Sequence, residues 1–150
     1  MPDGTFSKVE FDSWKQTIYD ACDTILDSSW YTNRTNRLID DLLKAEGKDP
    51  GREKNAADKA GKHAGTPMVM HFDSMGRPVL SILHNRNIAT NVDEYNHTKT
   101  EIDAEGNLLR VTDARETVEN GMRGNTVIQY KYDMLGNLVY QQSMDAGQLW

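Results

Sequence analysis

The sequence YDMLGNL at residues 132–138 decides the fold, because its pattern occurs twice more in the chain. The earlier copies are FDSMGR at 72–77 and IDAEGN at 102–107, so the three aspartates follow one another at intervals of 30 residues. A fourth stretch, FDSWKQ at 11–16, keeps the aspartate and lacks the glycine. This recurrence indicates a repeat protein in which one short structural unit is used several times.

Turn chemistry explains the spacing within each copy. An aspartate at the first position of a turn accepts hydrogen bonds from the backbone N–H groups that follow it. A glycine three positions later tolerates the positive φ that closes a short hairpin loop. We therefore predict a hairpin corner at each copy, with an architectural role for Asp73, Gly76, Asp103, Gly106, Asp133 and Gly136.

The segments between the corners have the pattern of β-strands. Apolar and polar residues alternate over much of 66–150, and this period of two is typical of half-buried strands. We interpret HNRN at 84–87 as a further break, and 113–125 as a turn interrupted by about eight residues. With that turn included, the underlying repeat is nearer about 20 residues than 30, and either length suits one hairpin per repeat.

The region before these strands has a different texture. The apolar residues of LIDDLL at 38–43 recur at helical spacing, with Asn33 or Thr35 as a possible N-cap and Gly47 as a possible end. Asp49 and Pro50 form a good start for a second helix. We predict a mainly β chain with three parts: strands and turns with a degenerate corner in 1–31, a helical insertion in 32–65 with its helices near 33–62, and antiparallel hairpins in 66–150. Disorder of 47–64 is the alternative.

Composition limits the classes of function. The formal net charge is -6 and the mean hydropathy is -0.71, which suits half-exposed sheet or a piece of a larger protein and does not favour nucleic acid as a partner. The single cysteine, Cys22, excludes an internal disulfide framework. No apolar run reaches the ~18–20 residues of a membrane span. The first residues lack the pattern of a signal peptide, so an exported parent protein would have its export signal outside this chain.

No catalytic or metal site is expected. Each corner offers one carboxylate, whereas a calcium loop needs several, and the four histidines lie far apart in sequence. Asp93 with Glu94, or Glu101 with Asp103, could place two carboxylates on one strand face, which is where a glycosidase hypothesis would begin. No facing partner is evident in the sequence, so we expect no enzyme, no metal and no cofactor.

Aromatic residues leave a second hypothesis open. If they lie in one exposed row they could stack on sugars, and the chain would then be a carbohydrate- or surface-binding module. Cross-strand pairing of aromatic side chains, which stabilises any sheet, is the simpler interpretation. The residues concerned are Tyr95, Tyr130, Tyr132, Tyr140 and Trp150.

The corners resemble the RHS/YD-repeat family, whose hallmark is Tyr-Asp-x-x-Gly-Arg/Asn-Leu. Residues 132–138 match this pattern fully, and the copies at 72 and 102 have Phe or Ile in place of Tyr. The chain departs from the pattern at Lys15, where the corner glycine is missing, and at 116–122, which looks inserted. Further stretches look like the RHS region in the B component of bacterial Tc insecticidal toxin complexes: VEFDSWKQ at 9–16, DTILDS at 23–28, HAGTP at 63–67, DSMGRP at 73–78 and SMDAG at 143–147.

The resemblance implies a ribbon of strands that spirals into a hollow shell around a toxic effector polypeptide. The self-cleaving aspartates of the family belong to an Asp-Pro-x-Gly type signature that this sequence lacks, so no catalytic residue is carried over. The implied role is a non-enzymatic segment of a toxin shell, secreted or exported as part of a larger toxin. The implied partners are other shell segments or toxin complex components and the enclosed effector, with self-association through exposed strand edges.

Overall fold

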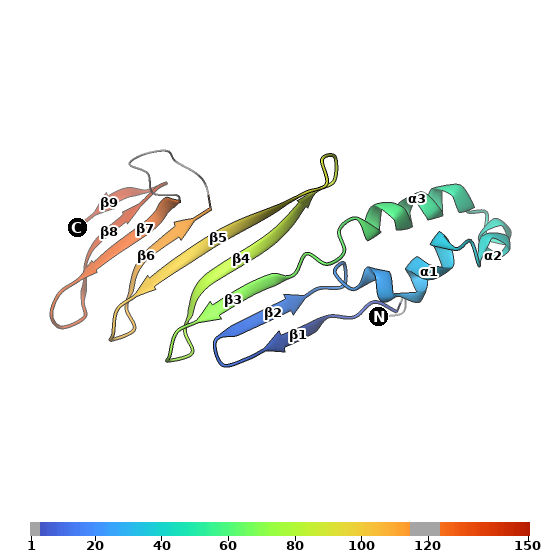
Figure 1. Ribbon diagram of the computed structural model, residues 1–150. Helices are drawn as coiled ribbons and strands as arrows, with labels where there is room; N and C mark the ends of the chain where they lie inside the picture. Colours follow the sequence, from blue (N-terminus) through green and yellow to red (C-terminus); the bar gives the residue numbers. More distant parts are fainter. Residues whose placement is uncertain (1–3, 115–123) are drawn as a thin grey trace. The chain divides into compact units, whose positions relative to one another are not determined.

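The computed structural model describes residues 4–114 and 124–150, and within them it contains nine strands and three short α-helices (Figure 1). The strands are β1 Lys8–Phe11, β2 Lys15–Tyr19, β3 Met68–Phe72, β4 Pro78–Asn87, β5 Val92–Ile102, β6 Leu108–Asp113, β7 Asn125–Tyr132, β8 Leu138–Ser143 and β9 Gly147–Leu149. The helical segments are the 3-10 helix η1 Ile25–Asp27, α1 Ser29–Thr35, α2 Asp40–Ala45 and α3 Pro50–Gly61.

Each strand is hydrogen-bonded to the next strand in the sequence, so the order in the sheet is β1 to β9 without a crossover. The pairs β1/β2, β3/β4 and β5/β6 are antiparallel, and so are the successive pairs from β6 to β9. The sheet is not closed, because β1 and β9 are its two end strands. These observations confirm the mainly β fold of antiparallel hairpins in series with a helical insertion.

The chain divides into two compact units. The first unit contains the helices and comprises 4–11, 16–68 and 84–94, and the second contains most of the strands and comprises 12–15, 69–83, 95–114 and 124–150.

The helical unit has a small core. Leu43 of α2 is 3% exposed, and Ala57 of α3 is fully buried. Gly61, at the end of α3, lies against the Tyr31 ring so closely that a Cβ atom there would come within 2.8 Å of a ring carbon. Because so little apolar surface is buried, hydrogen bonds and ion pairs contribute much of the packing specificity, as with Arg34 and Glu53, whose Nε and Oε2 atoms are 2.7 Å apart.

The first helix begins earlier than the sequence pattern predicts. The hydroxyl of Ser28 accepts a hydrogen bond from the N–H of Tyr31 at 3.0 Å and caps α1. Residues 30–31 are therefore helical rather than strand and turn, and Asn33 and Thr35, the expected caps, lie inside α1. The sequence analysis did not single out Ser28, because no apolar helical pattern directly follows this serine.

The second predicted helix begins where the sequence predicts, at Asp49 and Pro50. The carboxylate of Asp49 accepts a hydrogen bond from the N–H of Gly51 at 2.8 Å, and Pro50 is the first residue of α3. Helix α3 occupies the stretch for which disorder was the alternative. Gly47, the expected end of the preceding helix, follows α2 with a φ of +74°.

The expected break at 84–87 is wrong, because β4 continues through it to Asn87. The turn lies at 88–91 instead. There the side chain of Asn87 accepts hydrogen bonds from the N–H groups of Ala89 and Thr90, and Asn91 has a φ of +54°. Strand β4 is hydrogen-bonded to β5 here, and the Arg86 side chain forms a 2.7 Å ion pair with Asp93. In the other interrupted turn, Asp113 pairs with Asn125, and the segment 116–122 lies outside the described residues.

Candidate functional site

The hairpin corner at Asp73 is a closed set of hydrogen bonds. The Asp73 N–H donates to the carbonyl of Arg77 at 2.9 Å, and the Gly76 N–H donates to the carbonyl of Asp73 at 3.0 Å. One carboxylate oxygen of Asp73 accepts from the N–H groups of Met75 and Arg77, both at 2.9 Å. The other accepts from the Arg77 guanidinium at 2.7 Å. Gly76 has a φ of +76°, so this position requires a residue that tolerates the left-handed region.

The corners at Asp103 and Asp133 repeat this set of bonds. Asp103 accepts from the N–H groups of Glu105 and Asn107 at 3.0 and 2.8 Å, and from the Asn107 side chain at 2.9 Å. Asp133 accepts from the N–H groups of Leu135 and Asn137 and from the Asn137 side chain, all at 2.9 Å. The residue after the glycine, Arg or Asn, therefore completes each corner by donating to the aspartate.

The strand ladder shifts by one residue just before each of these aspartates. The irregularities lie between His71 and Phe72, between Glu101 and Ile102, and between Lys131 and Tyr132. Such a bulge turns the chain locally and re-aims the next side chain. The shift therefore falls at the aromatic or apolar residue that directly precedes each aspartate, which is Phe72, Ile102 or Tyr132.

The degenerate corner at Asp12 explains why a glycine is dispensable there. The Asp12 N–H donates to the carbonyl of Lys15 at 2.8 Å, so this loop closes one residue earlier than the loops with glycine. The carboxylate accepts from the N–H groups of Trp14 and Lys15, both at 2.8 Å. No residue of this shorter turn has a positive φ. The turn therefore retains the hydrogen bonds to the aspartate and does not need the glycine.

Hydrogen bonds outside the strand ladders tie neighbouring corners together. All four corners belong to the second unit and lie along the same end of its strands (Figure 1). The N–H of Phe72 donates to the carbonyl of Trp14 at 2.9 Å, and the Arg77 guanidinium donates to the carbonyl of Asp103 at 3.1 Å. The hydroxyl of Tyr132 donates to the carbonyl of Leu108 at 3.1 Å. The sequence analysis did not predict these lateral ties. The only indication of them in the sequence is that the repeat has side chains that can donate hydrogen bonds at the positions of Tyr132 and Arg77.

The carboxyl groups of the corners have lowered pKa values. Hydrogen bonds from the backbone and side chain of Arg77 lower the pKa of Asp73. The side chains of Asn107 and Asn137, together with backbone N–H groups, lower the pKa values of Asp103 and Asp133. Carboxylates held ionised by several donors favour a structural role over proton transfer.

The carboxylates of the glycosidase hypothesis are also engaged. Asp93 lies 2.7 Å from Arg86 Nε and 3.1 Å from His84 Nε2, and Glu101 lies 2.8 Å from Arg110 and 3.0 Å from Lys99. Hydrogen bonds from these partners lower the pKa of both carboxyl groups.

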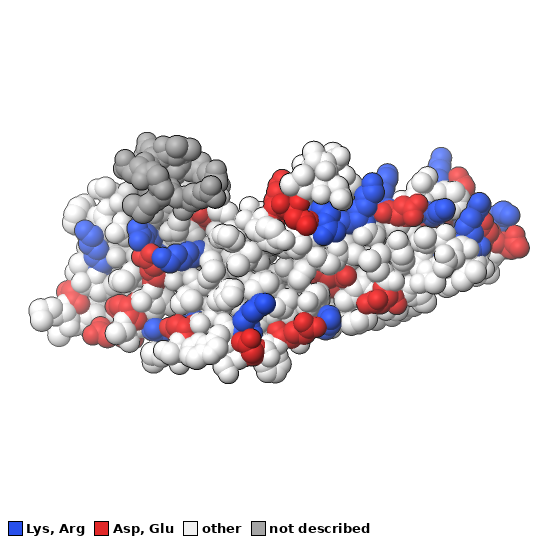
Figure 2. All heavy atoms as spheres, viewed as in Figure 1, with Lys and Arg blue, Asp and Glu red and all other residues white. Residues whose placement is uncertain are grey.

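A glycosidase needs one carboxyl group with a raised pKa as its acid. Among residues 4–114 and 124–150, every carboxyl group whose pKa departs from its ordinary value has a lowered pKa. Asp93 and Glu101 are ion-pair partners, and Asp103 is a hydrogen-bond acceptor of its corner. Acidic and basic side chains are correspondingly interspersed on the face in view in Figure 2.

The described part of the chain contains no group of three or more His, Cys, Asp or Glu residues arranged to hold a metal ion. It also contains no helix with the length and apolar character that crossing a bilayer requires.

The aromatic residues do not form one exposed row. Tyr140 is 7% exposed and its ring centroid lies 4.6 Å from that of Trp150. The rings of Tyr130 and Tyr132 are 6.4 Å apart. Tyr140 and Trp150 form a contact between neighbouring chain segments of the kind that stabilises a sheet, whereas Tyr130 and Tyr132 are neighbours on the same strand, β7. Tyr95 is 56% exposed and lines a separate hollow.

Comparison with known proteins gives structural neighbours. No family model matches the chain, and no curated protein matches it. The crystal structure of TcdB2-TccC3-Cdc42 matches with a TM-score of 0.67 and 20% identity, over 96% of this chain and 6% of that chain. A mutant of the Photorhabdus luminescens Tc holotoxin pore matches with a TM-score of 0.65 and 22% identity, over 97% of this chain and 6% of that chain.

These matches show the fold. The Tc toxin, RHS-like fold that the sequence resemblance implied is confirmed at that level, and this chain spans only 6% of the length of each matched chain.

Proposed function

We propose that this chain is a non-enzymatic structural segment of an RHS/YD-repeat toxin shell that encloses a toxic effector polypeptide. The observation that carries the proposal is a series of three corners that share one hydrogen-bonding scheme and a shorter fourth corner at Asp12, each tied to its neighbour. The likeness of nearly the whole chain to Tc toxin structures supports it. A repeat of this kind can be extended indefinitely, which is what an enclosing wall requires.

Enclosure needs no catalytic residue. Three corner carboxylates and one strand carboxylate are paired with arginine or asparagine, as expected for groups that hold a sheet together: Asp73, Asp103, Asp133 and Glu101. The function then belongs to the surface as a whole, and the segment contributes a wall with neither a cofactor nor a metal.

The end strands are where partners would bind. Strands β1 and β9 each have a neighbour on one side only within the described sheet. Unpaired backbone groups at a strand edge accept further strands. The partners on these edges would be adjacent shell segments or other toxin complex components, and in their absence a second copy of this chain. The larger toxin would be secreted or exported with its effector inside.

Charge at the two edges tests this proposal, because lysine on an edge strand opposes strand addition. The variants are Val9→Lys in β1 and Gln148→Lys in β9, with Ala89→Lys in the exposed 88–91 turn as the matched control. Sedimentation velocity over a range of protein concentrations should show association of the unmodified chain and of the control, and weaker association of both edge variants.

Two results would contradict the proposal. One is an unmodified chain that stays monomeric at every concentration while β-rich by circular dichroism. The other is an equal loss of association in the Ala89→Lys control, which would place the contact away from the edges.

A further inference from the structure

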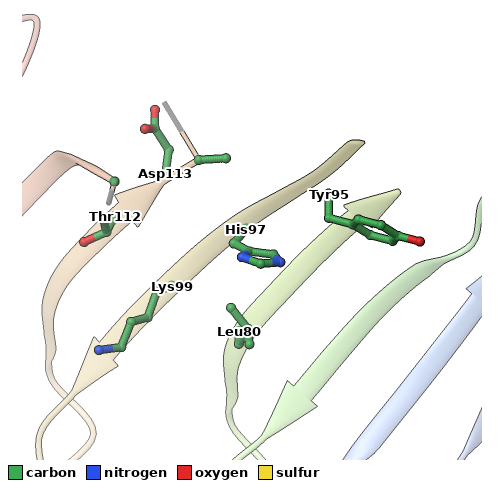
Figure 3. Close-up of a pocket in the computed structure, with 8 residues that line it drawn as sticks. Leu80, Tyr95, His97, Lys99, Thr112 and Asp113 are labelled. Carbon is green, nitrogen blue, oxygen red and sulfur yellow. The ribbon is translucent and has the colours of Figure 1, made fainter. Parts of the chain in front are cut away.

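The hollow on the β4–β6 face does not bring its polar groups together. Figure 3 shows that the side chains of Tyr95, Thr112 and Asp113, which line it, point away from one another. Exposed side chains in a repeated arrangement lie instead at the four hairpin corners of the second unit.

Each corner holds one exposed side chain at the same position, two residues after the aspartate. The backbone N–H of this residue donates to the aspartate carboxylate in every corner, at 2.8 to 3.0 Å. The same bond therefore fixes the point from which each side chain starts. These four residues, called the tip row below, are Trp14, Met75, Glu105 and Leu135.

Three members of the tip row are large and apolar, and all three face solvent. Trp14 is 57% exposed, Met75 is 70% exposed and Leu135 is 86% exposed. Met134, which precedes Leu135, is fully exposed as well. Single exposed apolar side chains are common on proteins, whereas a series of them at one place marks an interaction surface.

The distance between neighbouring tips is set by the sheet. The carbonyl of Trp14 accepts from the N–H of Phe72 at 2.9 Å, and the carbonyl of Asp103 accepts from the Arg77 guanidinium at 3.1 Å, so the corners are tied sideways. Successive corners are two strands apart in the sheet order. Since neighbouring strands lie about 4.8 Å apart, the tips recur at about 10 Å.

An α-helix matches this spacing. Seven residues of α-helix rise about 10.5 Å and return to nearly the same face. An extended segment covers the same distance in about three residues, and residues three apart in a strand point to opposite faces. A helix lying along the corners would therefore meet one tip in each heptad, over about 21 residues.

The charges of the corners favour a basic partner. The Glu105 carboxylate is exposed, and among the described residues it meets only the side-chain amide of Asn107, at 3.5 Å. It can therefore pair with an incoming basic group. The corners 12–15, 73–77, 103–107 and 133–137 together contain five carboxylates and two basic side chains: Asp12, Asp73, Asp103, Glu105 and Asp133 against Lys15 and Arg77.

Two other occupants fit the tip row less well. The tip row of a second copy would bring like charges together, which repel each other. The interior of a bilayer would take up the charge of Glu105 without a partner, which is costly. A protein surface that combines apolar and basic side chains avoids both costs.

We propose that the tip row binds a basic amphipathic α-helix of a partner protein. Apolar side chains of the helix would cover Trp14, Met75 and Leu135, and a lysine or arginine would lie beside Glu105. The site is at the ends of the strands, whereas the shell role places adjoining segments along strand edges, so either proposal can hold without the other.

Fluorescence anisotropy with the 150-residue chain and a labelled synthetic helix tests the proposal. The probe is a 28-residue peptide of four heptads, whose contact face has leucine in the first, second and fourth heptads and lysine in the third. Its other positions are alanine, glutamine and lysine, which favour a helix. We expect saturable binding, which Trp14→Ala should weaken by about ten-fold or more.

Leu42→Ala is the matched control. Leu42 is 57% exposed, as Trp14 is, and it lies in α2 of the helical unit. This variant should bind the peptide as the unmodified chain does. Equal losses in Leu42→Ala and Trp14→Ala would overturn the proposal, as would absence of saturable binding by the unmodified chain.

A charge exchange at Glu105 tests the register of the helix. Glu105→Lys should weaken binding of the lysine peptide by about three-fold or more. A second peptide, with glutamate in place of the contact lysine, should bind Glu105→Lys better than it binds the unmodified chain. Failure of this exchange would overturn the proposal.

The two other occupants are tested with the same variants. Sedimentation of the chain with phosphatidylcholine vesicles that is lost in Trp14→Ala would assign the tip row to a lipid surface and overturn the proposal. Self-association of the chain that is lost in Trp14→Ala would assign the tip row to a second copy and overturn it equally. We expect neither result.

Discussion

The row of hairpin corners at Asp12, Asp73, Asp103 and Asp133, called the corner row below, and the helical insertion are stabilised in different ways. Each corner with a glycine is closed by contacts within five residues, and the same bonds recur at 73, 103 and 133. The insertion is closed by contacts between distant residues. Asp23 accepts from Thr66 across 43 positions, and Arg86 donates to the Ala64 carbonyl across 22. The corners are therefore replaceable copies, whereas each contact in the insertion is unique.

This difference determines where a single substitution matters most. In the insertion the buried side chains are few, with Leu43 in α2 and Ala57 in α3, so we expect truncation of one to remove a large share of the packing. In the corner row a substitution affects one hairpin and its nearest neighbours. Four predictions follow this contrast, from the largest expected effect to the smallest.

Truncation of Leu43 should give the largest loss of stability. Leu43→Ala removes a side chain that is 3% exposed, and we expect a loss of about 2–5 kcal/mol from the transfer and cavity costs. The neighbouring Leu42→Ala is the control, because Leu42 is exposed and its truncation should cost well under about 0.5 kcal/mol. Urea unfolding followed by far-UV circular dichroism measures both. Equal losses in the two variants would show that α2 does not pack through Leu43.

Replacement of a corner glycine should have an intermediate effect. In Gly136→Val the new Cβ meets nothing within 4 Å, so the cost comes from the φ of +80° alone and should be about 1–3 kcal/mol. Gly136→Asn is the control, because asparagine tolerates the left-handed region and should cost much less. Thermal unfolding measures the difference. An unchanged melting temperature in the valine variant would contradict the turn assignment.

Loss of a lateral tie should have a smaller effect. Tyr132→Phe removes only the hydroxyl that donates to the Leu108 carbonyl, and we expect a loss of about 0.5–1.5 kcal/mol. In Tyr130→Phe, the matched control, the hydroxyl has no hydrogen-bond partner in the described part of the chain, so stability should be nearly unchanged. Amide hydrogen exchange at Leu108 and its neighbours should accelerate in the first variant alone. Identical exchange in both variants would argue against the tie.

Acid should weaken the three corners that contain a glycine. The folded pKa values of Asp73, Asp103 and Asp133 lie below the ordinary carboxyl value of about 3.9, so their contribution to stability is complete above about pH 4. This contribution to stability is lost as the pH falls through the lowered pKa values that the three aspartates have in the folded state. NMR titration of the amides of Gly76, Gly106 and Gly136 should show the corners opening only below about pH 4. Asp133→Asn should make its own corner insensitive to this change, and opening that begins near neutral pH would contradict the account.

The sequence predicts the corners well because their chemistry is local. Asp73 and Gly76 are four residues apart or fewer from every group that they bond within the turn, and the same holds for the other copies. The start of α3 at Asp49 and Pro50 is equally local. The strand series follows from the alternation of apolar residues, and from turns that allow only neighbouring strands to pair.

The features that the sequence did not predict depend on partners far along the chain or on a strand ladder. Strand pairing overrides the polar residues at 84–87, where Arg86 also reaches the carbonyls of Lys62 and Ala64. The hollow at Tyr95 combines residues from three strands with Gly124, which precedes β7, and no local motif marks it. The lateral tie from Arg77 to Asp103 joins two copies of the repeat that are individually complete.

The association state of the unmodified chain tests the central claim most directly. Multi-angle light scattering and circular dichroism should be measured together on one dilution series. We expect a β-rich species whose mass rises with concentration, as two open strand edges require. A β-rich monomer of 17.0 kDa at every concentration would contradict the claim that this chain is a section of a larger wall.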